Sequence, residues 1–84
     1  MVMLQTELEY DLLVDAREDR CPMPLLKAKL ALAKCQPGQI ICLMATDEGS
    51  LQDVPRYLDM VSHRLLEQAM VEDCCYFLIE KGVA

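Results

Sequence analysis

Two prolines in the sequence Cys21-Pro22-Met23-Pro24 restrict the possible fold of this chain more than any other feature. A proline has no backbone N–H and clashes with the preceding turn, so neither residue fits the interior of a helix. In the first turn of a helix the missing N–H has no intrahelical partner to lose. The prolines therefore predict a helix that begins at Pro22 and ends at Cys35, with Cys21 at its N-cap.

The side chain of Cys21 is predicted to be a nucleophilic thiolate. At an N-cap its sulfur would face free amides and the positive end of the helix dipole, which favours thiolate over thiol. Arg20 precedes it, and five of the eight lysine and arginine residues lie within residues 17–34. The chain has a net charge of −6, yet this basic segment is expected to stabilise a thiolate and to attract an acidic partner.

The pattern of apolar residues predicts a single α+β domain over residues 1–84, with disorder expected within residues 1–8. Strands are predicted at 9–16, 39–46, 64–71 and 74–81, and helices at 22–35 and 50–61. The order β-α-β-α-β-β has too few helices to cover both faces of a sheet. We therefore expect a two-layer α/β sandwich in which a mixed four-stranded sheet carries both helices on one face.

Each predicted helix has an apolar stripe that is expected to face the core. In the first helix the stripe consists of Met23, Leu26, Leu30 and Ala33. In the second helix it consists of Leu51, Val54, Leu58 and Val61. Pro55 lies inside this second helix and is expected to move its start or to bend its first turn. Asp47, Ser50 and Asp53 are interpreted as turn and capping residues, not as catalytic ones.

Charge and cysteine content exclude several classes of function. No apolar run approaches the roughly 20 residues that cross a bilayer, and the acidic N-terminal segment is unlike a secretory signal. We expect a cytoplasmic monomer that binds neither membranes nor, given its negative charge, nucleic acid directly. Five cysteines in that compartment are expected to be unpaired. The chain has no Cys-x-x-Cys pair and one histidine, so we expect neither a metal nor a cofactor. That histidine, His63, is interpreted as a packing or hydrogen-bonding residue.

Three motifs in order make the chain resemble the TusA/SirA-like family of small sulfur-carrier proteins over about residues 12–79. The first is Cys-Pro-x-Pro at residues 21–24, preceded by Asp-Ala-Arg at 15–17. The second, at residues 45–55, is similar to A-T-D-x-x-S-x-x-D-[IV]-P, and the third, at residues 63–66, is similar to the end of G-H-x-L-L. The resemblance implies a carrier that holds sulfur as a persulfide on Cys21 and has a role related to tRNA thiolation.

This resemblance implies protein partners: a cysteine desulfurase-like donor and a sulfur-acceptor protein. The residues expected to support Cys21 or to contact these partners are Arg17, Arg20, Pro22, Met23, Pro24 and Lys27. Two alternatives stay open at this point. The chain would be a non-catalytic regulatory or adaptor module if Cys21 only capped the helix, or a redox-sensing thiol protein if Cys21 oxidised to a sulfenic acid.

The sequence departs from the family pattern beside the cysteine. Glu18 and Asp19 replace the usual Gly-Leu, and Ser62 replaces a glycine before His63. Two carboxylates at this point are expected to weaken the positive field at Cys21 and to raise its pKa. They would also change the docking surface, which indicates a paralogue of the tRNA-thiolation carrier.

Overall fold

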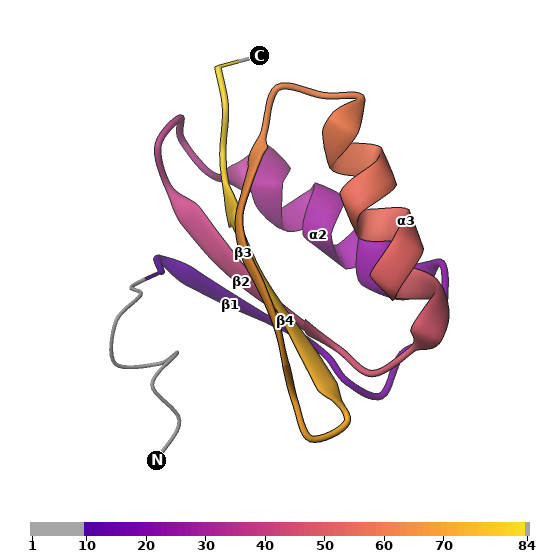
Figure 1. Cartoon of the computed structure of the whole chain (residues 1–84). Helices are drawn as coiled ribbons and strands as arrows, with labels where there is room; N and C mark the ends of the chain where they lie inside the picture. Colours follow the sequence, from indigo (N-terminus) through magenta and orange to yellow (C-terminus); the bar gives the residue numbers. More distant parts are fainter. Residues whose placement is uncertain (1–9, 84) are drawn as a thin grey trace.

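The computed structural model describes residues 10–83, so the disorder expected within residues 1–8 concerns residues outside the described part. The elements follow the predicted order (Figure 1). They are β1 (Leu12–Ala16), α2 (Met23–Lys34), β2 (Ile40–Ala45), α3 (Glu48–Asp59), β3 (Arg64–Val71) and β4 (Cys74–Glu80).

The four strands form one mixed sheet in the order β1-β2-β4-β3. Strand β1 is parallel to β2, whereas β4 is antiparallel to both β2 and β3. Parallel neighbours need a crossover connection, which α2 supplies, while β3 and β4 are joined by a tight turn. Both helices lie on one face of the sheet (Figure 1), so the predicted two-layer α+β sandwich is confirmed.

Strand β3 has the predicted ends, and the ends of the other elements differ from the prediction by at most three residues. The first strand begins at Leu12, and Glu9, its predicted first residue, lies outside the described part of the chain. Asp11, just before the strand, bonds to Ile40 twice: its N–H donates to the Ile40 carbonyl at 2.7 Å, and its carboxylate accepts the Ile40 N–H at 2.8 Å. The second helix begins at Glu48 rather than at Ser50 and ends at Asp59. Pro55 neither moved its start towards the C-terminus nor stopped the helix, although its missing N–H removes one helical hydrogen bond.

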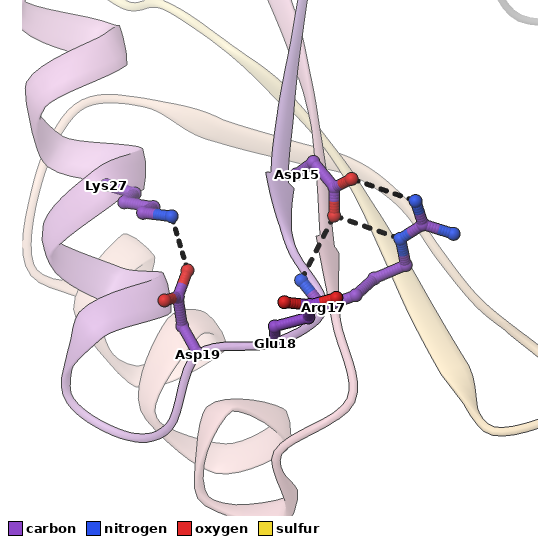
Figure 2. Close-up of a pocket in the computed structure, with 5 residues that line it drawn as sticks. All are labelled: Asp15, Arg17, Glu18, Asp19 and Lys27. Carbon is purple, nitrogen blue, oxygen red and sulfur yellow. Dashed lines mark hydrogen bonds and ion pairs between the residues drawn. The ribbon is translucent and has the colours of Figure 1, made fainter.

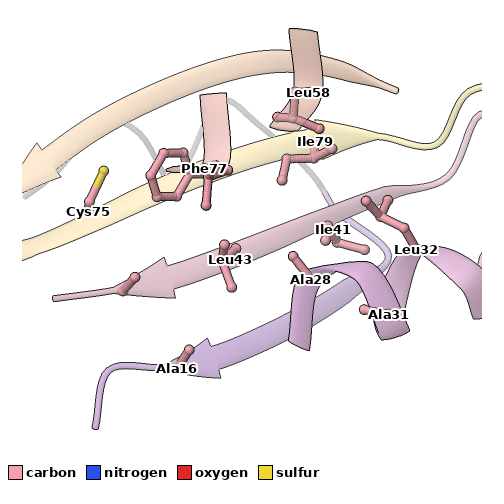
Figure 3. Close-up of a cluster of buried hydrophobic side chains, with 12 residues drawn as sticks. Ala16, Ala28, Ala31, Leu32, Ile41, Leu43, Leu58, Cys75, Phe77 and Ile79 are labelled. Carbon is pink, nitrogen blue, oxygen red and sulfur yellow. The ribbon is translucent and has the colours of Figure 1, made fainter. Parts of the chain in front are cut away.

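A compact apolar core lies between the sheet and the two helices (Figure 3). Strands β2 and β4 are the central strands and contribute the largest share of it. Their largest fully buried side chains are Ile41, Leu43, Phe77 and Ile79. Because these strands are flanked on both sides, the cluster forms a rigid base from which the loops at the sheet edge extend.

The predicted buried stripe of α2 is wrong. Met23, Leu26 and Leu30 are exposed, Leu30 by 65%. The helix instead buries Pro24, Ala28, Ala31 and Leu32, and Figure 3 shows the last three facing the strands. Apolar residues occur on both sides of α2, so their spacing does not determine which side is buried. The small alanines let the helix approach the sheet closely.

The stripe predicted for α3 is correct in its middle and wrong at its end. Val54 and Leu58 are buried, and Leu51 is half-buried against the core. Val61 lies beyond the helix and is exposed. The helix ends two residues earlier than predicted, at Asp59, so Val61 no longer shares the helical periodicity.

Candidate functional site

Cys21 lies in the loop between β1 and α2, at the edge of the sheet where the parallel strands β1 and β2 end and both helices begin. Its side chain is exposed. The first helical hydrogen bond of α2 is donated by the Leu26 N–H to the Pro22 carbonyl at 3.0 Å, which makes Pro22 the N-cap. The prediction that Cys21 occupies the N-cap is therefore wrong by one residue. The sulfur is not capping the helix that it precedes.

The side chain of Cys21 contacts the first turns of α3 instead. Its Sγ donates a hydrogen bond to Oδ2 of Asp53 at 2.9 Å. Gly49 lies one turn before Asp53, and a Cβ at that position would be 3.1 Å from the Cβ of Cys21. Residues four apart share one face of a helix, so Gly49 leaves room for the cysteine that Asp53 binds.

A second carboxylate belongs to this site. Asp47 is the N-cap of α3, but its side chain makes no capping hydrogen bond. Its Oδ2 atom is buried and has no hydrogen-bond partner among the described residues. The interpretation of Asp47, Ser50 and Asp53 as turn and capping residues holds only for the position of Asp47 at the N-cap. Ser50 is buried within α3, and Asp53 binds Cys21.

These contacts reverse the expected electrostatics of the sulfur. The hydrogen bond to Asp53 is the main cause that raises the pKa of Cys21, and burial and the charges of Asp53 and Asp47 raise it further. These contacts therefore oppose the lowering of the Cys21 pKa that the helix dipole and Arg20 were expected to cause. A carboxylate that accepts the proton of a thiol favours its protonated state.

Two of the predicted supporting cations are paired with carboxylates close to them in the sequence (Figure 2). The Arg17 guanidinium donates two hydrogen bonds to Asp15, at 2.9 and 2.8 Å. These bonds hold the pKa of Asp15 at about 2. Lys27 forms an ion pair with Asp19. With Glu18, these four side chains line an open hollow of about 570 Å³.

Glu18 and Asp19, which replace the usual Gly-Leu of the family, have a different role from the one that the sequence suggested. The carboxylates that raise the pKa of Cys21 are Asp53 and Asp47, not Glu18 and Asp19. Asp19 is held by Lys27, and its N–H donates to the Ala16 carbonyl at 3.1 Å in a tight turn. Glu18 and Asp19 therefore shape the surface beside the cysteine without setting its ionisation.

The remaining predicted site residues divide between surface and core. Arg20, Pro22 and Met23 are exposed near the cysteine. Pro24, in the first turn of α2, is fully buried, so it supports the fold and is not available to a partner. A hollow lined in part by Arg20, Asp47 and Glu48 connects the loop to the start of α3.

The other four cysteines are less accessible than Cys21. Cys42 is 6% exposed, as predicted for a small buried side chain, and burial raises its pKa to about 11. Cys35 caps the far end of α2, about 18 Å away at 1.5 Å per residue. Cys74 and Cys75 are consecutive residues of β4, so their side chains point to opposite faces of the sheet, as predicted.

His63 has the structural role predicted for it. Its Nδ1 accepts a hydrogen bond from the Gly82 N–H at 2.9 Å, far from the cysteine in the sequence. Within residues 10–83, no cluster of three or more His, Cys, Asp or Glu side chains is placed to hold a metal ion. None of the helices in the same residues is long and apolar enough to cross a membrane.

Asp53 is the main residue of the site that sequence reasoning missed. The available signal was its spacing from Gly49, four residues earlier within the motif at residues 45–55. The predicted helix began at Ser50 and left Gly49 in a turn, whereas in the structure both residues lie on one face of α3. The interpretation of these residues as helix caps accounted for them without any contact to a distant segment. The sequence alone gave no reason to place that face against Cys21, which is 32 residues away.

Comparisons with known proteins relate this chain to sulfur carriers. The family model described as Sulfurtransferase TusA matches residues 13–81. The Bacillus subtilis protein YrkI is 36% identical over 75 residues, which are 89% of this chain and 100% of that protein. Sulfur carrier protein TusA of Allochromatium vinosum is 33% identical over 74 residues, or 88% of this chain and 97% of that one.

A solved structure has the same fold. The SirA-like protein of Desulfitobacterium hafniense superposes with a TM-score of 0.74. The match covers 87% of this chain and 100% of the other, with 21% sequence identity. The arrangement of four strands and two helices is therefore shared although few residues are.

Proposed function

This chain belongs to the TusA sulfurtransferase family, and we propose that it is a sulfur carrier that holds sulfane sulfur as a persulfide on Cys21. The observation that carries the proposal is the position of Cys21 in the Cys-Pro-x-Pro sequence. It is exposed at the edge of the sheet, whereas the other four cysteines are buried or half-buried. A partner protein can reach this sulfur without opening the fold.

The proposed relay has two thiol-exchange steps. In the first, the sulfur of Cys21 attacks the terminal sulfur of a persulfide on a cysteine desulfurase-like donor. The new S–S bond forms as the donor's S–S bond breaks, and the donor cysteine leaves as a thiolate with the electron pair. In the second, a thiolate of the acceptor protein attacks the terminal sulfur, and Cys21 leaves as a thiolate. No outside oxidant is needed, because one persulfide is exchanged for another.

Helix α2 supports docking of partner proteins beside the sulfur. It exposes Met23, Leu26 and Leu30 in a row that begins next to Cys21. The same helix carries three lysines and no acidic residue, so it suits a partner surface that is apolar and acidic. We place this exchange in the cytoplasm, with the carrier acting as a monomer on protein partners in a role related to tRNA thiolation, without binding nucleic acid directly.

Membership of the TusA family favours the carrier over the redox-sensor alternative. Oxidation to a sulfenic acid, like uptake of sulfur, follows the thiolate character and exposure of a cysteine. The hydrogen bond to Asp53 raises the pKa of Cys21 and so opposes both reactions in the free protein. The adaptor alternative needs no reactive thiol, and no contact of Cys21 favours it.

Mass spectrometry of Cys21→Ser tests the proposal. The wild-type chain, incubated with a cysteine desulfurase and cysteine, should gain the mass of one sulfur atom on the peptide that contains Cys21. The serine variant should gain none and should fold normally, because its hydroxyl can donate the same hydrogen bond to Asp53. Cys35→Ser and Cys74→Ser are matched controls that should still load.

Loading of the Cys21→Ser variant would contradict the proposal, because another cysteine would then carry the sulfur. Treatment with peroxide separates the alternatives in the same assay. A redox sensor would gain oxygen at Cys21 and no sulfur, and an adaptor would gain neither.

A further inference from the structure

The hydrogen bond between Cys21 and Asp53 links two segments that are 32 residues apart. It joins the loop before α2 to the second turn of α3. Gly49 lets the two approach, since a Cβ there would be only 3.1 Å from the Cβ of Cys21. Asp53 is half-buried, and no salt bridge among the described residues neutralises its carboxylate.

We propose that Asp53 is a positioning residue that restrains Cys21 in the free carrier, so that uptake and release of the sulfur are slow until a partner docks. The inference rests on the proposed function and extends it to the control of the same cysteine. Its basis is the contact of the thiol with an unneutralised carboxylate on a different element.

Both steps of the relay require Cys21 to carry the charge of a thiolate. During loading, the thiolate is the attacking group, because a thiol is a poor nucleophile. During release, the acceptor thiolate forms a bond to the terminal sulfur, the S–S bond breaks, and Cys21 departs with the electron pair. A leaving thiol with a raised pKa leaves more slowly. The Asp53 carboxylate therefore slows both the loading and the release of sulfur.

The charged groups around the sulfur come from two elements. From α3 and its N-cap, Asp53 and Asp47 face Cys21, and both raise its pKa. From the loop, Arg20 is the adjacent cation, while Lys27 on α2 is held by Asp19. The acidic groups prevail at the sulfur, so the restraint ends when a docked partner neutralises Asp53 or separates it from Cys21.

Alkylation of Cys21 by iodoacetamide, followed peptide by peptide as a function of pH, tests the restraint in the empty carrier. Asp53→Asn removes the charge and keeps the shape. It should react at least about threefold faster than wild type at pH 7, because removal of a neighbouring negative charge favours the thiolate. At pH 10 the advantage should vanish or reverse, because a thiolate of lower pKa is intrinsically less nucleophilic. Asp59→Asn, at the far end of α3, is the matched control and should behave as wild type.

Release is tested on carriers loaded chemically with inorganic polysulfide. Loss of the added sulfur to a small thiol such as dithiothreitol should be at least about threefold faster from Asp53→Asn than from wild type or Asp59→Asn. The proposal would be overturned by identical pH profiles of wild type and Asp53→Asn, or by slower release from the variant.

The outcomes separate this inference from the proposed function. A wild-type chain that accepts sulfur from neither polysulfide nor a desulfurase would overturn the carrier function and, with it, the proposed control of the relay. Loading that depends on Cys21, together with an unchanged alkylation profile in Asp53→Asn, would overturn the role of Asp53 alone. If Asp53→Asn does not fold, the alkylation rate of wild-type Cys21 at pH 7 is compared with that of the small thiol N-acetylcysteine. Equal rates would also overturn the role of Asp53.

Discussion

At the scale of single residues, Gly49 determines how closely α3 can approach the cysteine loop. It lies in the first turn of α3, and an added Cβ would be 2.9 Å from Oδ2 of Asp47 and 3.1 Å from the Cβ of Cys21. Contacts this short do not persist, so one of these neighbours would have to move. The hydrogen bond between Cys21 and Asp53 thus depends on the absence of a side chain at position 49.

We expect Gly49→Ala to displace Cys21 and to weaken its hydrogen bond to Asp53. The thiol should then alkylate faster at pH 7 than in the wild type, although no charge has been changed. Alanine is the better helix former by up to about 1 kcal/mol, which should offset part of the steric cost. Alkylation rates and thermal unfolding measure the two effects. Gln52→Ala, an exposed position of the same helix, is the control. An unchanged alkylation rate in Gly49→Ala would show that Cys21 does not need this space.

At the scale of elements, α2 presents apolar side chains on both of its sides. One side packs on the sheet through Ala28, Ala31 and Leu32, and the other exposes Met23, Leu26 and Leu30 to solvent. The exposed leucines of this basic helix are not stabilised by burial in the core of this protein. Their position beside Cys21 is consistent with a surface that is covered only when a partner is bound.

Two leucines of α2 should therefore respond very differently to truncation. Leu32 is 1% exposed, and Leu32→Ala should lower the free energy of unfolding by about 2–5 kcal/mol through lost burial and a new cavity. Leu30→Ala should change it by less than about 0.5 kcal/mol. Urea unfolding of both variants checks this. Equal losses would mean that the exposed side of α2 is packed in solution.

At the scale of the whole molecule, the edge opposite Cys21 is held together by the C-terminal segment. The Gly38 N–H donates to the Lys81 carbonyl at 2.9 Å, and the Lys81 ammonium donates to the Leu32 carbonyl at 2.6 Å. The Gly82 N–H donates to His63. These bonds connect the end of α2, the start of β2 and the loop before β3. The edge that carries Cys21 is thus the one left open to partners.

The bond to His63 predicts a loss of stability in mild acid. Burial and the nearby Lys81 lower the pKa of His63, whose Nδ1 must be unprotonated to accept the Gly82 N–H. The unfolded chain therefore binds this proton more readily than the folded one. The stability that unprotonated His63 contributes is fully present above the pKa of histidine in the unfolded chain, about 6.5. It is lost as the pH falls through the lower pKa of His63 in the folded chain.

Unfolding by urea at pH 7 and pH 5 measures this effect. Between pH 7 and pH 5 the free energy of unfolding of the wild type should fall by an amount that approaches the net free energy of one hydrogen bond, about 0.5–1.5 kcal/mol. His63→Gln, which does not titrate, should lose less between the same two pH values. Equal losses in wild type and variant would assign the pH dependence to other groups.

The sequence by itself determined the order of elements, the start of α2 to within one residue, and the identity of the exposed cysteine. These features depend on local properties: a proline lacks an N–H wherever it stands, and strand and helix periods are visible in short windows. Only the tertiary structure decided which side of α2 is buried, and that Asp53 binds Cys21. The reason is that helix orientation follows from packing against the sheet as a whole. The charge at a sulfur likewise depends on groups brought near it by folding, here from 32 residues away.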